Sequence, residues 1–229
     1  MMCGRFTITL TVGLGERFCV HLDREIAPQY NVAPSEQAPV IFRTEAGTGR
    51  ELGMMQWGLV PSWEKNPATA RRPINARAET LLTQPLFRSA ALHRRCLVPA
   101  TGFLEWRREG RVKVPYYIRR KDGQLMAFAG IYELWQGHAP EPLRTFTIVT
   151  TTPNPLVARY HDRMPAILLP EHESCWADSG EAGEKDLPDI LLPYPEELLE
   201  AYQVSAAVNS PKNKGPEVLR PAGDRQLPF

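Results

Sequence analysis

The chain has 229 residues, of which 43% are hydrophobic and 23% are charged, and its 27 lysines and arginines nearly balance its 26 acidic residues. This composition is typical of a globular protein with a substantial core, and it excludes a disordered chain. A formal net charge of +1 excludes a protein that attracts nucleic acid by bulk charge alone. No stretch reaches the roughly 20 apolar residues of a membrane-spanning helix, and no basic-then-apolar leader is present, so we expect a cytoplasmic protein.

The first third of the chain alternates short regular segments with turns. We expect strands at 4–9, 40–43 and 52–59, and a two-turn helix at 15–22. Prolines make 28–34 irregular, and glycines between 47 and 49 join the second and third strands. The following 61–72 segment is predicted as a long loop, and long loops in compact domains are often functional.

The remainder of the chain is richer in strands. Helices are predicted at 78–82 and 85–95, with Pro85 in a first turn. Strands at 96–106, 116–120 and 125–134, separated by hairpin turns at Glu109-Gly110 and Asp122-Gly123, predict a meander. Further strands are expected at 146–152, 166–169 and 203–208, and helices at 154–160, 171–176 and 195–202. We expect a single domain over 1–220 and a C-terminal tail over 221–229.

Charge and cysteine placement limit the kinds of site. Arginines crowd the middle of the chain while acidic residues gather between 181 and 200, which predicts either a basic face opposite an acidic one or a mixed, solvated surface (Arg71, Arg72, Arg77, Arg88, Arg94, Arg95). The four cysteines form no CxxC pair, which indicates reduced thiols. The two His-x-x-Cys pairs, at 93–96 and 172–175, do not supply four clustered ligands, so we expect no metal and no cofactor.

Cys3 near the start of the chain is the most informative residue. If Met1 and Met2 are removed, Cys3 carries a free α-amine beside its thiol. The reference pKa of such an amine is about 7.7 to 8.0, so a sizeable minority is unprotonated and nucleophilic near neutral pH. An aldehyde can condense with this amine to an imine, and the thiol can then close a five-membered thiazolidine ring. The alternative is that Cys3 is a small buried hydrophobe at the start of a strand.

Seven sequence blocks occur in order along the chain, and a segment at 208–213 follows them. They are Cys3-Gly4-Arg5-Phe6, 30–34 (YNVAP), 57–61 (WGLVP), 74–80 (INARAET), 96–106 (CLVPATGFLEW), 149–151 (VTT) and 161–165 (HDRMP). In these blocks the chain resembles the SOS-response-associated peptidase (SRAP) family. The resemblance implies a single α+β domain, with a curved, mostly antiparallel, barrel-like sheet and peripheral helices.

The resemblance also implies an activity. Members of this family bind single-stranded DNA and capture abasic sites covalently through a mature N-terminal cysteine, which yields a thiazolidine DNA–protein crosslink that shields the lesion during the DNA damage response. The expected partner is therefore single-stranded DNA with abasic sites. The protein is expected to be monomeric, and nucleoid-associated if bacterial. Reversal of the crosslink and lyase activity are further expectations.

Four residues match the family's catalytic positions. Cys3 is the nucleophile, and Glu105, desolvated between Leu104 and Trp106, is expected to have a raised pKa and to move protons. His161 would assist proton transfer at the sugar, and Asn75 would orient the cysteine or the sugar through its amide. The alternatives are an outward-facing glutamate and a structural histidine.

The remaining candidates are expected to contact DNA. Arg77 should face the same way as Asn75 if that segment is extended, and its guanidinium suits a phosphate; surface salt bridges are the alternative. Trp63 resembles an aromatic residue that stacks on a base, although Glu64 stands where relatives carry a second aromatic. The other expected contacts are Arg5, Asn31, Trp106, Thr150 and Arg163.

Two further hypotheses stay open. Cys3 could be the nucleophile of an N-terminal-nucleophile peptidase that acts on other proteins, with its own amine as base. Alternatively, the protein could bind single-stranded DNA without covalent chemistry. Met2 is not a small residue, so exposure of Cys3 requires that translation starts at Met2 or that the protein removes its own N-terminal residues.

Overall fold

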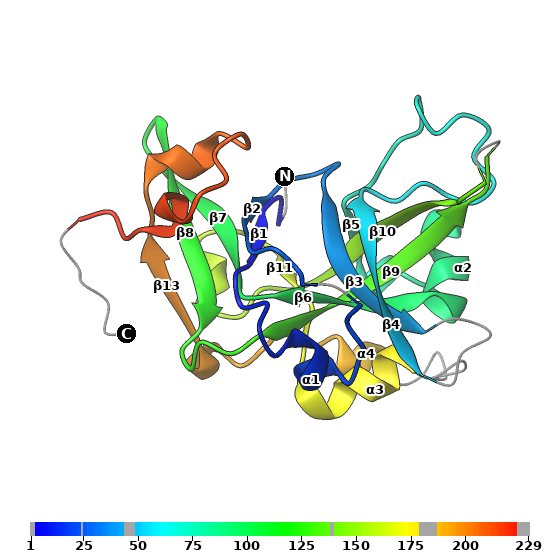
Figure 1. Cartoon of the computed structure of the whole chain (residues 1–229). Coiled ribbons are helices and arrows are strands. Elements are labelled where there is room, and N and C mark those ends of the chain that lie inside the picture. Colours follow the sequence, from blue (N-terminus) through cyan, green and yellow to red (C-terminus); the bar gives the residue numbers. More distant parts are fainter. Residues whose placement is uncertain (1–2, 24, 44–48, 138–139, 179–186, 224–229) are drawn as a thin grey trace.

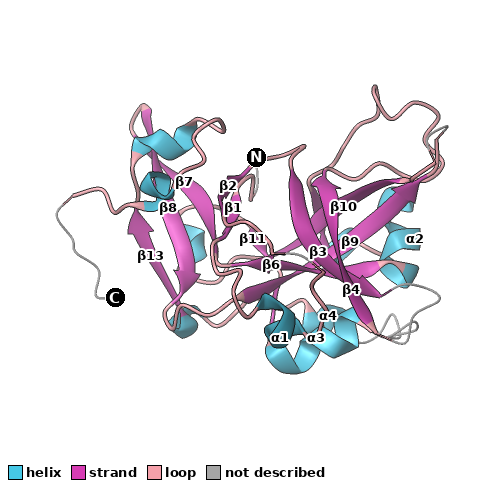
Figure 2. Ribbon diagram, viewed as in Figure 1, coloured by secondary structure: helices cyan, strands magenta, loops and turns pink. Residues whose placement is uncertain are grey.

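The computed structural model describes residues 3–23, 25–43, 49–137, 140–178 and 187–223, which form two β-sheets surrounded by short helices (Figures 1 and 2). The smaller sheet is antiparallel throughout and has the strand order β13-β8-β7-β1-β2. Its strands are β1 (Phe6–Ile8), β2 (Gln29–Val32), β7 (Gly102–Glu109), β8 (Val112–Arg120) and β13 (Leu199–Gln203).

The larger sheet closes on itself. Its strands are β3 (Gln37–Arg43), β4 (Arg50–Trp57), β5 (Asn75–Arg77), β6 (Arg95–Ala100), β9 (Met126–Trp135), β10 (Leu143–Thr151), β11 (Met164–Pro165) and β12 (Ile167–Leu168). Because β10 pairs with both β4 and β9, the path β10-β4-β3-β6-β9 forms a closed five-stranded barrel. The β10–β4 and β10–β5 pairings are parallel and the others antiparallel, which confirms the predicted α+β fold with a curved, mostly antiparallel core.

The helices are α1 (Leu14–Phe18), α2 (Pro85–His93), α3 (Pro170–Ala177) and α4 (Leu187–Ile190). Pro85 occupies the first turn of α2, as predicted. One apolar core joins the helices to outward-facing residues of the barrel strands, such as Leu97 and Ile131. None of the described helices has the length and apolar character that crossing a membrane requires.

A second core lies between the barrel and the smaller sheet. The Phe6 ring of β1 packs edge-on against Trp57 and Phe128 of the barrel, with centroid distances of 5.2 and 6.2 Å. Phe103 of β7 meets Phe128 at 6.1 Å, and Trp57 stacks on Phe146 at 6.3 Å. These aromatic side chains hold β1 and β7 against the barrel, and thereby place residue 3 between the sheets.

The single strand predicted over 96–106 is wrong, because the chain changes sheets at Thr101. β6 pairs in the barrel and ends at Ala100, whereas β7 begins at Gly102 and pairs with β1 and β8. At this point the Thr7 hydroxyl contacts the hydroxyls of Thr101 and Tyr117, both at 2.8 Å. A Cβ on Gly102 would lie 2.4 Å from the Tyr117 ring, so only glycine permits this packing.

The predicted meander is also wrong. Glu109-Gly110 does form the β7–β8 hairpin, with Gly110 at φ 61°, but Asp122-Gly123 links β8 to β9, which belong to different sheets. The helix predicted over 195–202 is a short 3-10 turn followed by β13, because this stretch pairs with five residues of β8. The strand predicted over 203–208 is likewise wrong, since Ala206–Asn209 is a 3-10 turn.

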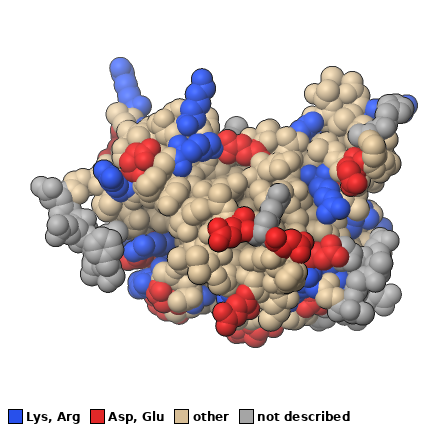
Figure 3. All heavy atoms as spheres, viewed as in Figure 1, with Lys and Arg blue, Asp and Glu red and all other residues tan. Residues whose placement is uncertain are grey.

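Of the two charge arrangements that the sequence left open, the structure favours the mixed one (Figure 3). Arg95 is buried over the Trp176 ring, Arg94 pairs with Glu133, and Arg72 binds Gln56, so the arginines of 71–95 form no common basic face. Figure 3 shows basic and acidic side chains interspersed. At the predicted start of the tail, Pro221 still bridges to Val204. The predicted turn at 47–49 falls largely outside the described residues, as do 181–186 and the end of the tail.

Candidate active site

Cys3 lies buried between the two sheets and contacts a buried carboxyl group. Its backbone nitrogen donates a hydrogen bond to Glu105 Oε1 at 2.9 Å. The antiparallel register of β1 and β7 causes this contact, because Phe6 pairs with Phe103 and the chain before Phe6 runs back along β7 toward Glu105. Cys3 has a φ of 24°, a value that residues other than glycine rarely adopt. The structure therefore holds the Cys3 nitrogen in a specific, strained orientation.

Glu105 is one of the few buried acidic side chains, with 2% of its surface exposed. Burial raises its pKa to about 8, and this effect outweighs the hydrogen bond from the Cys3 nitrogen, which lowers the pKa. Alternation along β7 turns Phe103 toward the inter-sheet core, whereas Leu104 packs on the opposite face. Glu105, two residues after Phe103, lies on the same face of β7 as that core residue. The carboxyl group is mostly protonated at pH 7 and can act as an acid.

The Cys3 thiol keeps its proton more strongly than the thiol of an activated cysteine nucleophile does. Burial, and then the charge of Glu105, raise the pKa of the Cys3 thiol well above its ordinary value. The thiolate is therefore scarce near neutral pH, and the thiol needs a neighbouring base when it reacts. Glu105, once it has given up its proton, is such a base.

His161 lies on a segment that packs against β7 and β8. Tyr160 packs on Tyr116 with ring centroids 4.6 Å apart, and Tyr116 is the cross-strand partner of Glu105. The charge of Asp162 adds to the raised pKa of Glu105, which also places this segment near the carboxyl group. The structure thus brings the 160–162 segment, with His161, to the same end of the sheet as Cys3 and Glu105.

Two contacts at His161 Nδ1 require opposite protonation states. Nδ1 accepts a hydrogen bond from the Arg163 backbone N–H at 3.2 Å, and it also lies 2.8 Å from Asp162 Oδ1. Burial lowers the pKa of His161 against the opposing effect of Asp162. The Asp162 side chain is 83% exposed and free to turn into water, so we assign the neutral ring with Nδ1 as acceptor and the proton on Nε2.

Asn75 and Arg77 lie on β5, which runs parallel to β10. Ala76 between them is buried and Arg77 is exposed, so the extended segment turns Asn75 and Arg77 to one face, as predicted. Trp57 Nε1 binds the Ile74 carbonyl oxygen at 2.8 Å and anchors the start of β5 beside the aromatic core.

Arg5, Asn31 and Trp106 form a second cluster that binds the 208–213 segment. Arg5 Nη1 donates to Asn31 Oδ1 at 2.7 Å and to the Val208 carbonyl oxygen at 3.1 Å. The Asn31 amide donates to three carbonyl oxygens of that segment, and Trp106 Nε1 donates to Asn209 Oδ1 at 2.7 Å. These polar groups attach the 208–213 segment to the smaller sheet, a role that sequence reasoning missed.

Thr150 and Arg163 form a third cluster, together with Glu79. Arg163 binds Glu79 through both Nη atoms and also binds the Thr150 carbonyl oxygen at 2.6 Å. The side chain of Thr150 is buried and its hydroxyl donates to the Ala76 carbonyl oxygen at 3.4 Å. Sequence reasoning quoted Glu79 within a family block but gave it no role; the only signal was an acidic residue two positions after Arg77.

Trp63 stands apart from the catalytic groups, on the loop between β4 and β5. It is 56% exposed, which suits an aromatic side chain that stacks on a ligand. The loop is anchored nearby, because Trp135 Nε1 donates to the Glu64 carbonyl oxygen at 2.6 Å. The residue that replaces a second aromatic, Glu64, thus contributes its backbone to the position of Trp63.

The surface above β1 and β2 is hollowed between two raised rims (Figure 3). Lysine and arginine side chains rise from the rim formed by the β7–β8 hairpin and the 208–214 segment. The exposed basic residues there are Arg108, Arg111, Lys113, Lys212 and Lys214. Such a rim suits a polyanion. Within the described ranges, no three His, Cys, Asp or Glu side chains gather as metal ligands.

The chain is similar to known proteins over nearly its whole length. It is 42% identical to the abasic site processing protein YoaM of Bacillus subtilis, over 95% of this chain and 97% of that protein. It is 30% identical to the abasic site processing protein HMCES of Xenopus tropicalis, over 95% of this chain and 78% of that protein. A crystal structure of a protein from Bacteroides thetaiotaomicron superimposes with a TM-score of 0.86 at 31% identity, over 96% of this chain and all of that one.

The sequence model of one protein family matches residues 2–211, a range that includes every candidate site residue described above. The resemblance inferred from the sequence blocks is therefore confirmed, and the chain belongs to the SOS response associated peptidase (SRAP) family.

Proposed function

We propose that this protein processes abasic sites in single-stranded DNA by capturing the lesion covalently through Cys3. The hydrogen bond between the Cys3 nitrogen and the buried Glu105 carboxyl group carries this proposal, because it joins the reacting atom to an acid whose pKa is raised by burial. The names of the relatives in Bacillus subtilis and Xenopus tropicalis support the lesion as the substrate. The hollow with its basic rim supports DNA as the ligand.

The reaction requires the α-amine of Cys3. Hydrolysis of the peptide bond between Met2 and Cys3 consumes one water and frees this amine. Met1 and Met2 lie outside the described residues, and their removal by the protein itself is part of the proposal. The opened abasic deoxyribose presents an aldehyde; the amine adds to it, and loss of water gives an imine. The Cys3 sulfur then adds to the carbon of the protonated imine and gives its proton to the Glu105 carboxylate, which closes the thiazolidine ring.

Glu105 and His161 divide the proton transfers. Protonated Glu105 donates a proton to the departing hydroxyl during imine formation, and the resulting carboxylate accepts the thiol proton during ring closure. The neutral His161 ring, with its proton on Nε2, is a hydrogen-bond donor for the sugar. Asn75 and Arg77 would orient the sugar and its phosphate from β5, and Trp63 would stack on a neighbouring base.

The thiol argues against the peptidase alternative. A cysteine peptidase attacks with a thiolate, but burial and Glu105 raise the pKa of the Cys3 thiol well above its ordinary value. An amine-first reaction avoids this difficulty, since the sulfur attacks only after the electrophile is already attached. Reversal of the crosslink and strand cleavage by a lyase step would use the same imine.

The first experiment is a denaturing gel of the protein with an oligonucleotide that carries one abasic site. An undamaged oligonucleotide and the Cys3→Ser protein are the controls, and intact mass first establishes whether Cys3 is the N-terminal residue. We expect a band that survives heat and detergent, requires the abasic site and is absent for Cys3→Ser. No such band from protein with a free Cys3 amine would overturn the proposal. Cleavage of a foreign peptide that is lost in Cys3→Ser would favour the peptidase, and binding that persists without adduct would favour the non-covalent module.

A further inference from the structure

Arg163 is a buried residue directly before β11, and its side chain binds β10 and the 3-10 turn Ala78–Thr80. Its side chain is 8% exposed. Its guanidinium holds both oxygens of Glu79, at 2.5 and 2.8 Å, and also the carbonyl oxygen of Thr150 at 2.6 Å. Thr150 of β10 lies between Arg77 of β5 and Pro165 of β11 in the sheet register. The Arg163 side chain therefore connects the start of β11, across β10, to the turn that follows β5.

The same residue holds the catalytic histidine. The Arg163 backbone N–H donates to His161 Nδ1, and a single residue separates the two along the chain. This hydrogen bond occupies the Nδ1 lone pair and leaves the ring proton on Nε2. Because the backbone of Arg163 can shift only as far as its side chain allows, the fork to Glu79 restricts the orientation of the imidazole ring.

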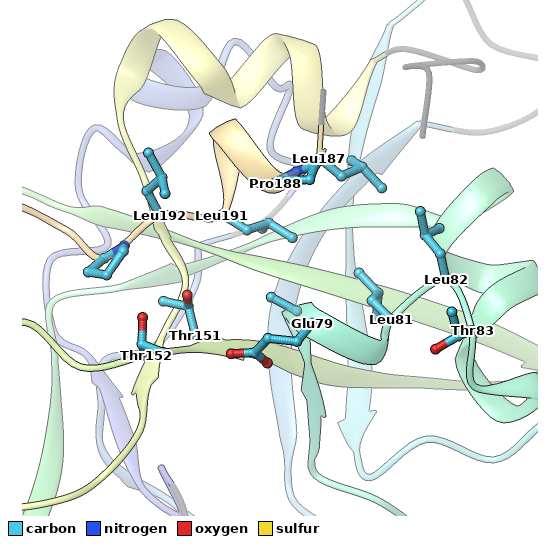
Figure 4. Close-up of a pocket in the computed structure, with 12 residues that line it drawn as sticks. Glu79, Leu81, Leu82, Thr83, Thr151, Thr152, Leu187, Pro188, Leu191 and Leu192 are labelled. Atoms are coloured by element: carbon cyan, nitrogen blue, oxygen red, sulfur yellow. The ribbon is translucent and has the colours of Figure 1, made fainter. Parts of the chain in front are cut away.

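Glu79 cannot reach the reacting atoms itself. It lines a cavity of about 420 Å³ on which none of Cys3, Glu105 and His161 borders. Figure 4 shows its carboxylate directed toward Thr151 and Thr152, away from Leu81 and Leu82. The cavity wall is otherwise largely apolar, so Glu79 has Arg163 as its main polar partner there. Arg163 joins Glu79 to His161 through hydrogen bonds, whereas Glu79 acts on Arg77 through charge alone.

We propose that Glu79 is a positioning residue for the reaction: it fixes Arg163, so that the Arg163 backbone N–H keeps His161 Nδ1 as an acceptor and Nε2–H directed to the sugar. This inference rests on the proposed function and adds a residue to its site. It also has a consequence for DNA binding. Glu79 offsets the charge of Arg163, so its removal should not weaken attraction to a polyanion.

The decisive variant is Glu79→Gln, which keeps the side-chain size but loses the charge and one of the two acceptor oxygens. We expect its maximal crosslinking rate at saturating DNA to fall at least about tenfold, a typical loss for a displaced catalytic group. Its Kd for undamaged single-stranded DNA should stay the same or become tighter. Glu79→Asp, which keeps the charge, should recover part of the rate.

A spectroscopic measurement on the protein without DNA tests whether Glu79 positions His161 through Arg163. The ¹⁵N shifts of the His161 ring should report Nε2–H in the wild-type protein, and a mixture of tautomers in Glu79→Gln. The matched control is Glu173→Gln, which breaks an equivalent two-point pair with Arg17, between α1 and α3. We expect this control to lower stability but to leave the His161 shifts and the crosslinking rate of the folded protein unchanged.

The outcomes separate the two proposals. If the wild-type protein forms no crosslink, the proposed function fails. The ¹⁵N shifts of the His161 ring still test whether Glu79 positions that ring. If the wild-type protein crosslinks and Glu79→Gln matches it in rate and in His161 shifts, the positioning role is overturned. The role is equally overturned if Glu79→Gln loses rate and DNA affinity together, in proportion to its loss of folded protein.

Discussion

At the scale of single residues, the site combines two costly features. Glu105 is a carboxyl group held in an apolar environment, and Cys3 has a backbone conformation that side chains disfavour. Neither feature helps the fold, and the proposed chemistry would use both. While the Cys3 nitrogen is still an amide, burial gives Glu105 a pKa of about 8.

The raised pKa of Glu105 predicts how stability depends on pH. The ordinary pKa is 4.5, so between pH 4.5 and about 8 the unfolded chain is ionised while the folded chain keeps its proton. The free energy of unfolding should therefore fall as pH rises through this window, by about 1.4 kcal/mol per pH unit, and level off above it. Glu105→Gln has no proton to lose, so it should be more stable than the wild-type protein at pH 8.

Urea denaturation at pH 5, 7 and 9 measures this difference. The preparations must still carry Met1 and Met2, as judged by intact mass, because a free ammonium group at Cys3 would lower the pKa of Glu105. Parallel stability curves for the two proteins would contradict the assigned pKa. At pH 5 the α-amine is protonated in both proteins, so the measurement at this pH serves as the reference for the other two.

At the scale of elements, the buried side chain of Asn31 makes more hydrogen bonds to the 208–213 segment than Arg5 or Trp106 does. Asn31 on β2 donates to the carbonyl oxygens of Val208, Ser210 and Asn213, and accepts from Arg5. Lys214 adds a bond from its Nζ atom to the Asn31 carbonyl oxygen at 2.7 Å. This side chain thus attaches the basic rim of the hollow to the sheet that carries Cys3.

A pair of substitutions distinguishes the two functions of the Asn31 amide. Asn31→Asp keeps the acceptor for Arg5 but replaces both donor hydrogens with a charge that faces carbonyl oxygens. We expect it to lower the free energy of unfolding by about 2 to 4 kcal/mol, at least as much as Asn31→Ala, because buried carbonyl groups lose their partners. Faster amide exchange over 206–213 should accompany this loss. Near-normal stability of Asn31→Asp would instead show that the Arg5 contact dominates.

At the scale of the whole molecule, the candidate catalytic groups come from two sheets that share one core. Glu105 lies on the smaller sheet, whereas Asn75 lies on β5 beside the barrel strand β10. Aromatic side chains join these sheets, and Phe128 touches one from each of β1 and β7. Because the core is continuous, the sheets should unfold together.

Phe128→Ala tests this continuity. Loss of the buried ring should lower the free energy of unfolding by about 3 to 5 kcal/mol. We expect far-ultraviolet circular dichroism and tryptophan fluorescence to give coincident urea transitions in both the variant and the wild-type protein. Two separate transitions in the wild-type protein would show that the barrel and the smaller sheet are independent units.

The sequence by itself determined the residue chemistry and the fold class of this protein. The blocks from Cys3 to 208–213 identified the family, and local patterns located most strands, the Glu109-Gly110 hairpin and the Pro85 helix start. These features depend on residue type and on near neighbours along the chain, so they can be predicted without a structure.

Only the tertiary structure decided which partner each strand and polar group finds. The chain changes sheets at Thr101, and Leu199–Gln203 becomes a strand because the edge of β8 offers it hydrogen bonds. The hydrogen bond from Cys3 to Glu105 joins residues 102 positions apart. The Glu79–Arg163 pair joins residues 84 positions apart. Each of these outcomes depends on groups distant in sequence, whose proximity exists only once the two sheets have packed together.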